Sequence, residues 1–277
     1  MNIVLGFLVV AVVTALAVLV MLRVRRTAPV GSYFTDGDRA SGVFGVLATG
    51  FSVLLGFIVF LSFTTYDASR SGAEEEAVIV RQQFETAQFF GGDLAAELSG
   101  QLVCYGRSVA GEEWDRLEAG TLGDEINPWG AAMFESLRRF EPATNAEQSA
   151  YDRWLDQTSA REQARIERVH AVSGVIPGPL WIVLFFVSGV IFLYLLFFAD
   201  SGEGAATQAV LMGSVVSVIT TLLLLLVFFN QPFQEGVGGL RPDSMERTLR
   251  VIDEAAAATG IEVTPPCDHR GQALDPG

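Results

Sequence analysis

The 277-residue sequence contains no lysine, so all 18 of its basic residues are arginine. A chain without lysine has neither the phosphate-binding lysine of a P-loop nor a Schiff-base lysine. Histidine is also scarce: His170 and His269 are the only two, and their separation does not match the spacing of metal ligands. We therefore predict no catalytic residues, no cofactor and no metal, and we do not expect an enzyme.

Positive charge is scarce relative to negative charge. The 18 basic residues face 32 acidic ones, which gives a formal net charge of −14 at pH 7. Because binding to phosphates is driven by positive charge, this balance argues against a nucleic-acid partner. It argues equally against attachment to anionic lipid through a polybasic surface.

Charged residues are absent from four long apolar runs, residues 3 to 22, 43 to 64, 180 to 198 and 208 to 229. A helix needs about 20 residues to cross the hydrocarbon core of a bilayer, so each run predicts a transmembrane helix. Ionisable residues inside such helices usually mark proton relays and ion-coupled transport. Their absence here disfavours a proton-driven transporter.

The spacing of the four spans predicts an all-α membrane protein with an acidic helical domain inserted between spans two and three. The domain contains 20 acidic residues and 10 arginines. Its acidic runs, Glu74 to Glu76 and Glu112-Glu113, are interpreted as parts of solvated helix faces. The predicted regions are residues 1–65 with two spans and a short Arg-rich loop, 66–179 as the domain, 180–229 as a transmembrane hairpin, and 230–277 as a tail with one amphipathic helix and a disordered end.

Helix starts are predicted at four places in the domain and the tail. Asn127 precedes a proline, in the order of an N-cap followed by proline at the first helical position. Thr144 and Glu147 have the spacing of a capping box. Asp93, after two glycines, is predicted to cap a further helix, and Asp243 with Glu246 is predicted to form a capping pair for the tail helix.

Basic residues beside the first span favour one orientation of the chain. RVRR directly follows this span, and arginines beside short loops favour the cytoplasmic side. The N-terminus, the large domain and the C-terminus would then lie outside. Arg161, Arg165 and Arg168, near the start of span three, favour the opposite orientation, but long segments are translocated largely regardless of their charge.

The two cysteines are Cys104 in the domain and Cys267 in the tail. The four predicted spans place both on the same side of the membrane, because two of them lie between the cysteines. In an oxidising compartment they could form a disulfide that ties the tail to the domain. Two separate buried thiols are an equal alternative.

Span four contains a stripe of small residues at four-residue steps, Ala209, Gly213, Ser217 and Thr221. Such a stripe lets two helices approach closely, as in GxxxG contacts, and this packing role is the favoured interpretation. The hydroxyl groups could instead line a polar path.

Four stretches together resemble the bestrophin-like domain family. They are GFIVFLSFTTYDASRSGAEEEA at 56 to 77, CYGRSVAGEEW at 104 to 114, RIERVHAVSGVIPGPLW at 165 to 181 and NQPFQEGVGGLRPDSMERTL at 230 to 249. The family consists of four-span membrane proteins, mostly bacterial, whose molecular function is not established. The resemblance implies a multi-pass protein of the bacterial inner (plasma) membrane, with the lipid bilayer as its surroundings.

A further similarity, in span two, is to bestrophins, which are pentameric anion channels. In these channels the corresponding helix lines the pore, and its apolar side chains form a narrow neck. The resemblance implies a homo-oligomer and makes Val53, Phe57 and Phe60 the candidates for a pore constriction.

Two functional hypotheses follow from the sequence and the resemblance. The first is an oligomeric ion channel in which span two lines an apolar constriction, because an uncharged constriction can gate by dewetting. The second is a non-conducting membrane scaffold or sensor whose acidic domain binds a protein partner, since the caps and ion pairs of that domain serve packing.

Overall fold

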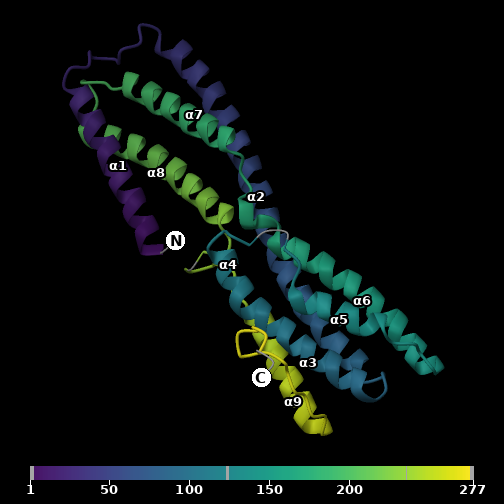
Figure 1. Cartoon of the computed structure of the whole chain (residues 1–277). Coiled ribbons are helices and arrows are strands. Elements are labelled where there is room, and N and C mark those ends of the chain that lie inside the picture. Colours follow the sequence, from purple (N-terminus) through teal and green to yellow (C-terminus); the bar gives the residue numbers. More distant parts are fainter. Residues whose placement is uncertain (1–2, 123–124, 235, 275–277) are drawn as a thin grey trace. The chain divides into compact units, whose positions relative to one another are not determined.

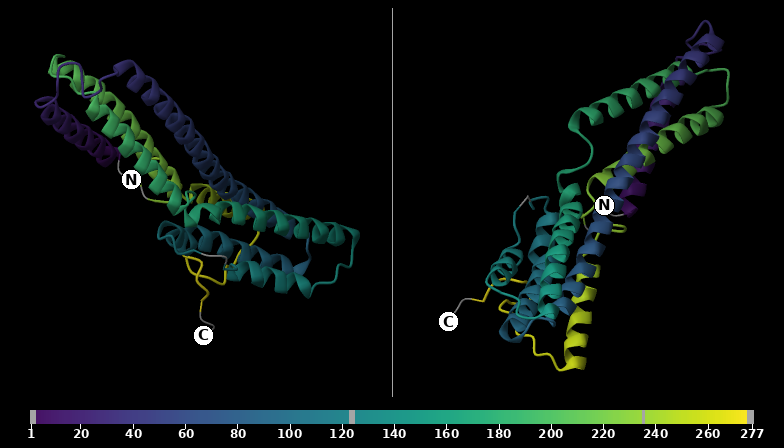
Figure 2. Two further views of the ribbon diagram at one scale, coloured as in Figure 1. Left: turned by 90° about the horizontal axis from the view of Figure 1, so that it is seen from above. Right: turned by 90° about the vertical axis from the view of Figure 1, so that its right-hand side faces the viewer.

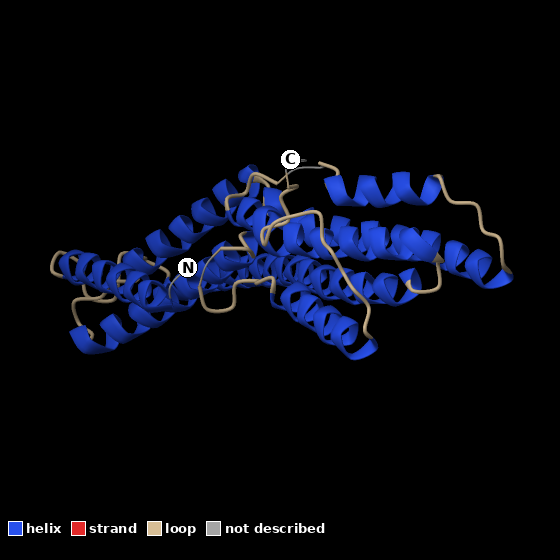
Figure 3. Ribbon diagram, turned by 60° about the horizontal axis from the view of Figure 1, so that its bottom comes forward, coloured by secondary structure: helices blue, strands red, loops and turns tan. Residues whose placement is uncertain are grey.

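The computed structural model describes residues 3–122, 125–234 and 236–274. Throughout these residues the regular elements are helices, and Figure 3 shows no strand among them. One isolated β-bridge joins Cys267 and Ala273. The predicted all-α fold is confirmed.

Internal contacts divide the chain into two compact units. Unit 1 comprises Met1–Thr64, Gly174–Gln231 and Gly236–Gly238. Unit 2 comprises Thr65–Ser173, Pro232–Glu235 and Gly239–Gly277. The long helix α2 contributes its first half to unit 1 and its second half to unit 2.

Unit 1 contains four helices that are long and apolar enough to cross a membrane (Figure 1). The four predicted spans are thus present as helices. Their packed core includes the fully buried side chains of Leu55, Leu184 and Leu226. The helices are α1 (Ile3–Arg25), the first half of α2 (Gly37–Ala87), α7 (Gly178–Phe197) and α8 (Ala205–Asn230).

Helix α2 is a single helix of 51 residues. At 1.5 Å per residue it is about 75 Å long, more than twice the thickness of a hydrocarbon core. No proline interrupts the sequence between Gly37 and Ala87, and the helix ends shortly before Gly91 and Gly92. The transition from apolar to acidic sequence after Tyr66 therefore takes place within one helix.

Unit 2 contains the second half of α2 and a set of further helices (Figure 2). Its core includes the buried side chains of Val80, Phe84, Leu102, Trp154 and Ile252. The surrounding elements are α3 (Gly92–Ser108), the π-helical turn η1 (Val109–Glu113), α4 (Trp114–Glu118), α5 (Pro128–Arg138), α6 (Asn145–Val169), the 3₁₀ turn η2 (His170–Ser173) and α9 (Asp243–Thr259).

Two of the four predicted helix caps are confirmed. The Asn127 side chain accepts hydrogen bonds from Trp129 N and Gly130 N, and Thr144 and Glu147 form a capping box. The caps predicted at Asp93 and Asp243 are wrong, because both residues lie inside the first helical turn and no side-chain cap bond precedes them. There their negative charges still interact favourably with the helix dipole.

The segment after α9 lies against α3 and α5. Cys267 forms a disulfide with Cys104, with an S–S distance of 2.08 Å. Trp129 Nε1 donates a hydrogen bond of 2.6 Å to Gly271 O, and Asp268 accepts from the backbone of Gln272. Up to residue 274 this segment is a loop held by these contacts rather than the disordered end that we predicted; residues 275–277 lie outside the described residues.

Candidate functional site

In unit 1, α2 has one packed face and one uncovered face. Phe51, Leu55 and Ile58 are buried in the core of this unit. The three candidates for the constriction lie on the other side of the helix: Val53, Phe57 and Phe60 are 69%, 59% and 61% exposed. A single chain therefore leaves a continuous apolar face of α2 without a covering element among the described residues.

Glycines lie along the same uncovered part of α2. A Cβ atom added at Gly42, Gly50 or Gly56 would meet no atom within 4 Å. These positions are therefore not explained by close packing inside the described chain. Glycines on an apolar transmembrane face allow the backbone of another helix to approach closely.

The small-residue stripe of α8 faces α1 at Gly213. A Cβ atom added at Gly213 would lie 3.4 Å from Thr14 Cγ2 and 3.5 Å from Val18 Cγ2. Ala209 and Ser217 are half-buried, whereas Thr221 is exposed and donates a hydrogen bond to Ser217 O. The hydroxyl of Thr221 is thus bound to its own helix.

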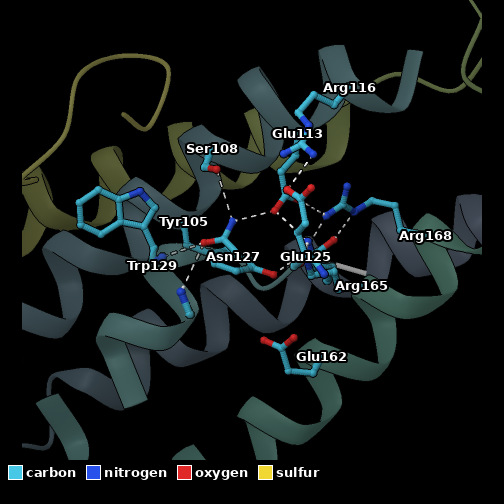
Figure 4. Close-up of polar contacts among 12 residues, drawn as sticks. Tyr105, Ser108, Glu113, Arg116, Glu125, Asn127, Trp129, Glu162, Arg165 and Arg168 are labelled. Carbon is cyan, nitrogen blue, oxygen red and sulfur yellow. Dashed lines mark hydrogen bonds and ion pairs between the residues drawn. The ribbon is translucent and has the colours of Figure 1, made fainter. Parts of the chain in front are cut away.

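Unit 2 contains a buried ionic cluster centred on Arg168, whose side chain is fully buried. Arg168 Nε donates to Glu76 Oε2 at 2.5 Å, and Arg168 Nη2 donates to Glu113 Oε2 at 2.7 Å (Figure 4). The Glu76 side chain is also fully buried. One guanidinium from α6 therefore binds two carboxylates, one from α2 and one from η1.

Three further donors complete the surroundings of the two carboxylates. Arg165 Nη2 donates to Glu113 Oε1 at 3.1 Å, and Asn127 Nδ2 donates to the same oxygen at 2.9 Å. Tyr105 Oη donates to Glu76 Oε1 at 2.5 Å. Asn127 thus caps α5 through its amide oxygen and holds Glu113 through its amide nitrogen.

Arg161 extends the row of arginines on α6. Its guanidinium lies 4.5 Å from the centroid of the Tyr105 ring, and its Nη1 donates to Gln83 Oε1 at 2.9 Å. Arg161, Arg165 and Arg168 follow one another at i, i+4 and i+7, which places all three on one helix face. The contacts of this face join α6 to α2, α3 and η1.

The cluster shifts the protonation equilibria of Glu113 and Tyr105. Burial acts to raise the pKa of Glu113, but the positive charges of Arg168 and Arg165 and the hydrogen bonds outweigh it, so this pKa is lowered. Burial, together with the negative charge of Glu76, raises the pKa of Tyr105 well above its usual value. At neutral pH Glu113 is therefore ionised and the Tyr105 phenol is neutral.

The cluster has the chemistry of a structural network. All four carboxylate oxygens of Glu76 and Glu113 accept hydrogen bonds from protein donors. In the described part of the chain no group of three or more His, Cys, Asp and Glu side chains is arranged to hold a metal. What the arrangement can do is fix three helices and η1 against one another.

The interpretation of the acidic runs as solvated faces is wrong for Glu76 and Glu113. Glu74, Glu75 and Glu112 are exposed, but Glu76 and Glu113 are buried as partners of the α6 arginines. A signal was present in the sequence: the three arginines share the helix face of Trp154, a residue expected in a core. Charges on such a face require buried partners of opposite sign.

Comparison with known proteins places the chain in a family. The model of the bestrophin-like domain matches residues 8–245, most of the sequence. The chain belongs to the bestrophin-like domain family. No curated protein matches this bestrophin-like chain significantly.

Solved structures with a similar fold include bacterial membrane proteins. One point mutant of a bacterial bestrophin homolog from Klebsiella pneumoniae has 12% sequence identity and a TM-score of 0.66, over 91% of this chain and 99% of that chain. A second mutant of the homolog has 11% identity and a TM-score of 0.63 over the same shares. At this identity the likeness establishes that the bestrophin-like chain shares their fold.

Proposed function

We propose that this bestrophin-like protein is an oligomeric ion channel in which α2 of each copy faces a central pathway. The observation that carries the proposal is the uncovered apolar face of α2. Val53, Phe57 and Phe60 lie on it, while the opposite face of the helix is packed against its own chain. In an assembly with a central axis, these side chains would form an apolar constriction.

The fold of the similar solved structures and the physics of narrow pores support this proposal. Bestrophins are anion channels, and this member of the bestrophin-like domain family shares the fold of bacterial bestrophin homologs. A constriction needs no charged group to control flow, because an apolar one can gate by dewetting. Phe57 and Phe60, one turn apart, would line such a constriction with bulky apolar rings, and a narrow apolar constriction excludes water.

We further propose that unit 2 lies outside the bilayer as an acidic helical domain, formed by residues 66–179 with the tail from 230 onward. Two observations favour its placement on the outer face of the inner membrane, with the N-terminus on the same side. Arg23 and Arg25 lie in the last turn of α1, and arginines at this end favour the cytoplasm for the first loop. The disulfide between Cys104 and Cys267 belongs to an oxidising compartment.

Ion flux through liposomes tests the constriction. Phe60→Ala should raise the flux relative to the unmodified protein, because it removes an apolar ring from the narrowest part of the pathway. Phe186→Ala is the matched control, since Phe186 is similarly exposed but lies on α7. Equal flux for the Phe60 variant and the unmodified protein, or a monomer in detergent, would contradict the proposal.

A second candidate function is a scaffold or sensor that binds a protein through the acidic surface of unit 2. The exposed acids Glu75 and Glu112 favour it, because neither belongs to the buried cluster. Cross-linking in native membranes, followed by purification of the intact chain and of a Glu75→Gln, Glu112→Gln variant, tests it. The same set of captured proteins from both would argue against this function.

A further inference from the structure

The uncovered face of α2 continues past its apolar part along the same helix. Phe60, Asp67 and Glu74 are seven residues apart, which is nearly two turns of an α-helix, so successive members of this series deviate by only about 20° around the axis. Because α2 is one helix from Gly37 to Ala87, this register is not interrupted between them. Asp67 follows Phe60 by about 10 Å along the axis.

Around Asp67 the opposite face of α2 is packed. Ser69 is fully buried and donates a hydrogen bond to Glu167 O. Gly72 lies so close to α6 that an added Cβ atom would be 2.6 Å from Arg168 N. Asp67, in contrast, is exposed. The side of α2 that carries Asp67 is therefore the side that its own chain leaves open.

Several arginines of unit 2 are bound to acidic partners other than Asp67. Arg70 is three residues from Asp67, but its Nε donates to Glu74 Oε1 at 3.0 Å. Arg161, Arg165 and Arg168 are buried in unit 2. Further arginines of this unit form surface ion pairs with acidic residues, namely Arg81 with Glu85, Arg116 with Glu125, Arg138 with Glu135 and Arg139 with Glu97.

The net charge of the whole chain is negative, like the charge of Asp67. Residues 66–179 and 230–277 contain 28 acidic residues and 14 arginines, and this excess accounts for the entire net charge of −14. The acidic excess therefore belongs to two segments: the one that follows the apolar half of α2 and the one that follows α8.

We infer that Asp67 determines the selectivity of the pathway and that the permeant ions are cations. The inference rests on the proposed pore, because only an assembly around α2 repeats Asp67 as a ring of carboxylates. Such rings favour cations in channels, and a negative vestibule raises the local concentration of cations. The distance of about 10 Å from Phe60 is close to the Debye length at 0.1 M salt, so the preference should strengthen at lower ionic strength.

Reversal potentials in a potassium chloride gradient test the inference, with purified protein in planar bilayers. The Phe60→Ala variant serves as the conducting background, and its reversal potential should have the sign of cation preference. Adding Asp67→Asn should move the potential toward zero, and Asp67→Arg should move it toward anion preference. Asp67→Glu should retain the cation preference, since it keeps the charge.

Asp156→Asn is the matched control, because it removes one exposed charge from α6 in the same unit. It should leave the reversal potential unchanged. A conducting Phe60→Ala protein with anion preference, or a potential that Asp67→Asn does not move, would overturn the inference and leave the channel in place. A Phe60→Ala protein that does not conduct would overturn the proposed function, and the inference with it.

Discussion

Removal of one member of the buried Arg168–Glu76 pair should lower the free energy of unfolding more than removal of both members. Arg168→Met leaves the carboxylates of Glu76 and Glu113 buried without their shared cation. Glu76→Met leaves Arg168 with a single carboxylate and Tyr105 Oη without its acceptor. The double variant Arg168→Met, Glu76→Met removes the most deeply buried charge pair as a whole. Neither charge of that pair then remains without its partner.

The structure sets the expected size of these effects. Breaking a buried ion pair by removal of one partner typically costs about 3–5 kcal/mol, whereas replacing the pair by apolar side chains is often close to neutral. Arg168→Met should lie at the upper end, since Arg168 serves two carboxylates. For a unit of this size, 3–5 kcal/mol corresponds to a fall of about 6–20 °C in melting temperature.

Intrinsic fluorescence during thermal unfolding in detergent is a suitable assay. Trp114, Trp129 and Trp154 all lie in unit 2, whereas Trp181 lies in unit 1. Arg70→Met is the control, because the Arg70–Glu74 pair is exposed and such pairs contribute less than about 1 kcal/mol. The reasoning would be refuted if the loss of stability in the double variant equalled the sum of the losses in the two single variants. Such additivity would show that Arg168 and Glu76 contribute independently.

Two other predictions concern the ends of α7 and α8 and the response to acid. Asn230→Ala should destabilise unit 1 by roughly 1–3 kcal/mol, because Asn230 Oδ1 accepts hydrogen bonds from Val175 N and Ile176 N. Asn230→Asp keeps an acceptor, so it should cost less stability in the same melting assay. Since the folded pKa of Glu113 is lowered, its contribution to stability is complete above the unfolded pKa of about 4.3 and is lost as pH falls through the folded value. Glu113→Gln should therefore weaken the pH dependence of the melting temperature below about pH 4, and an unchanged acid profile would contradict the role of this carboxylate.

Local and one-dimensional features were predictable from the sequence. Hydropathy over about 20 residues decides whether a helix can span a bilayer, so the four apolar helices follow from composition alone. The caps at Asn127 and Thr144 depend on side chains within three residues of one another. The continuity of α2 follows from the absence of proline between Gly37 and Ala87.

Long-range pairing was not predictable in the same way. Glu76 and Arg168 are separated by 92 residues in the sequence, and only the packing of α6 on α2 brings them together. The run Glu74 to Glu76 shows why: adjacent residues point 100° apart around a helix, so identical side chains meet solvent or core according to the rotation of the helix. The same rotation decides that Val53 is exposed while Leu55 is buried.

The buried cluster also changes the weight of the evidence on membrane orientation. Arg161, Arg165 and Arg168 favoured a cytoplasmic position for this segment when they were counted as basic residues beside a span. Their presence now has another explanation, since Glu76 and Glu113 require buried cations wherever unit 2 lies. Arg25, at the end of α1, bonds instead to the backbone oxygens of Ser201 and Glu203. With the disulfide on the side of unit 2, the balance of these arguments favours an N-terminus and a unit 2 outside the cytoplasm, as in the proposed topology.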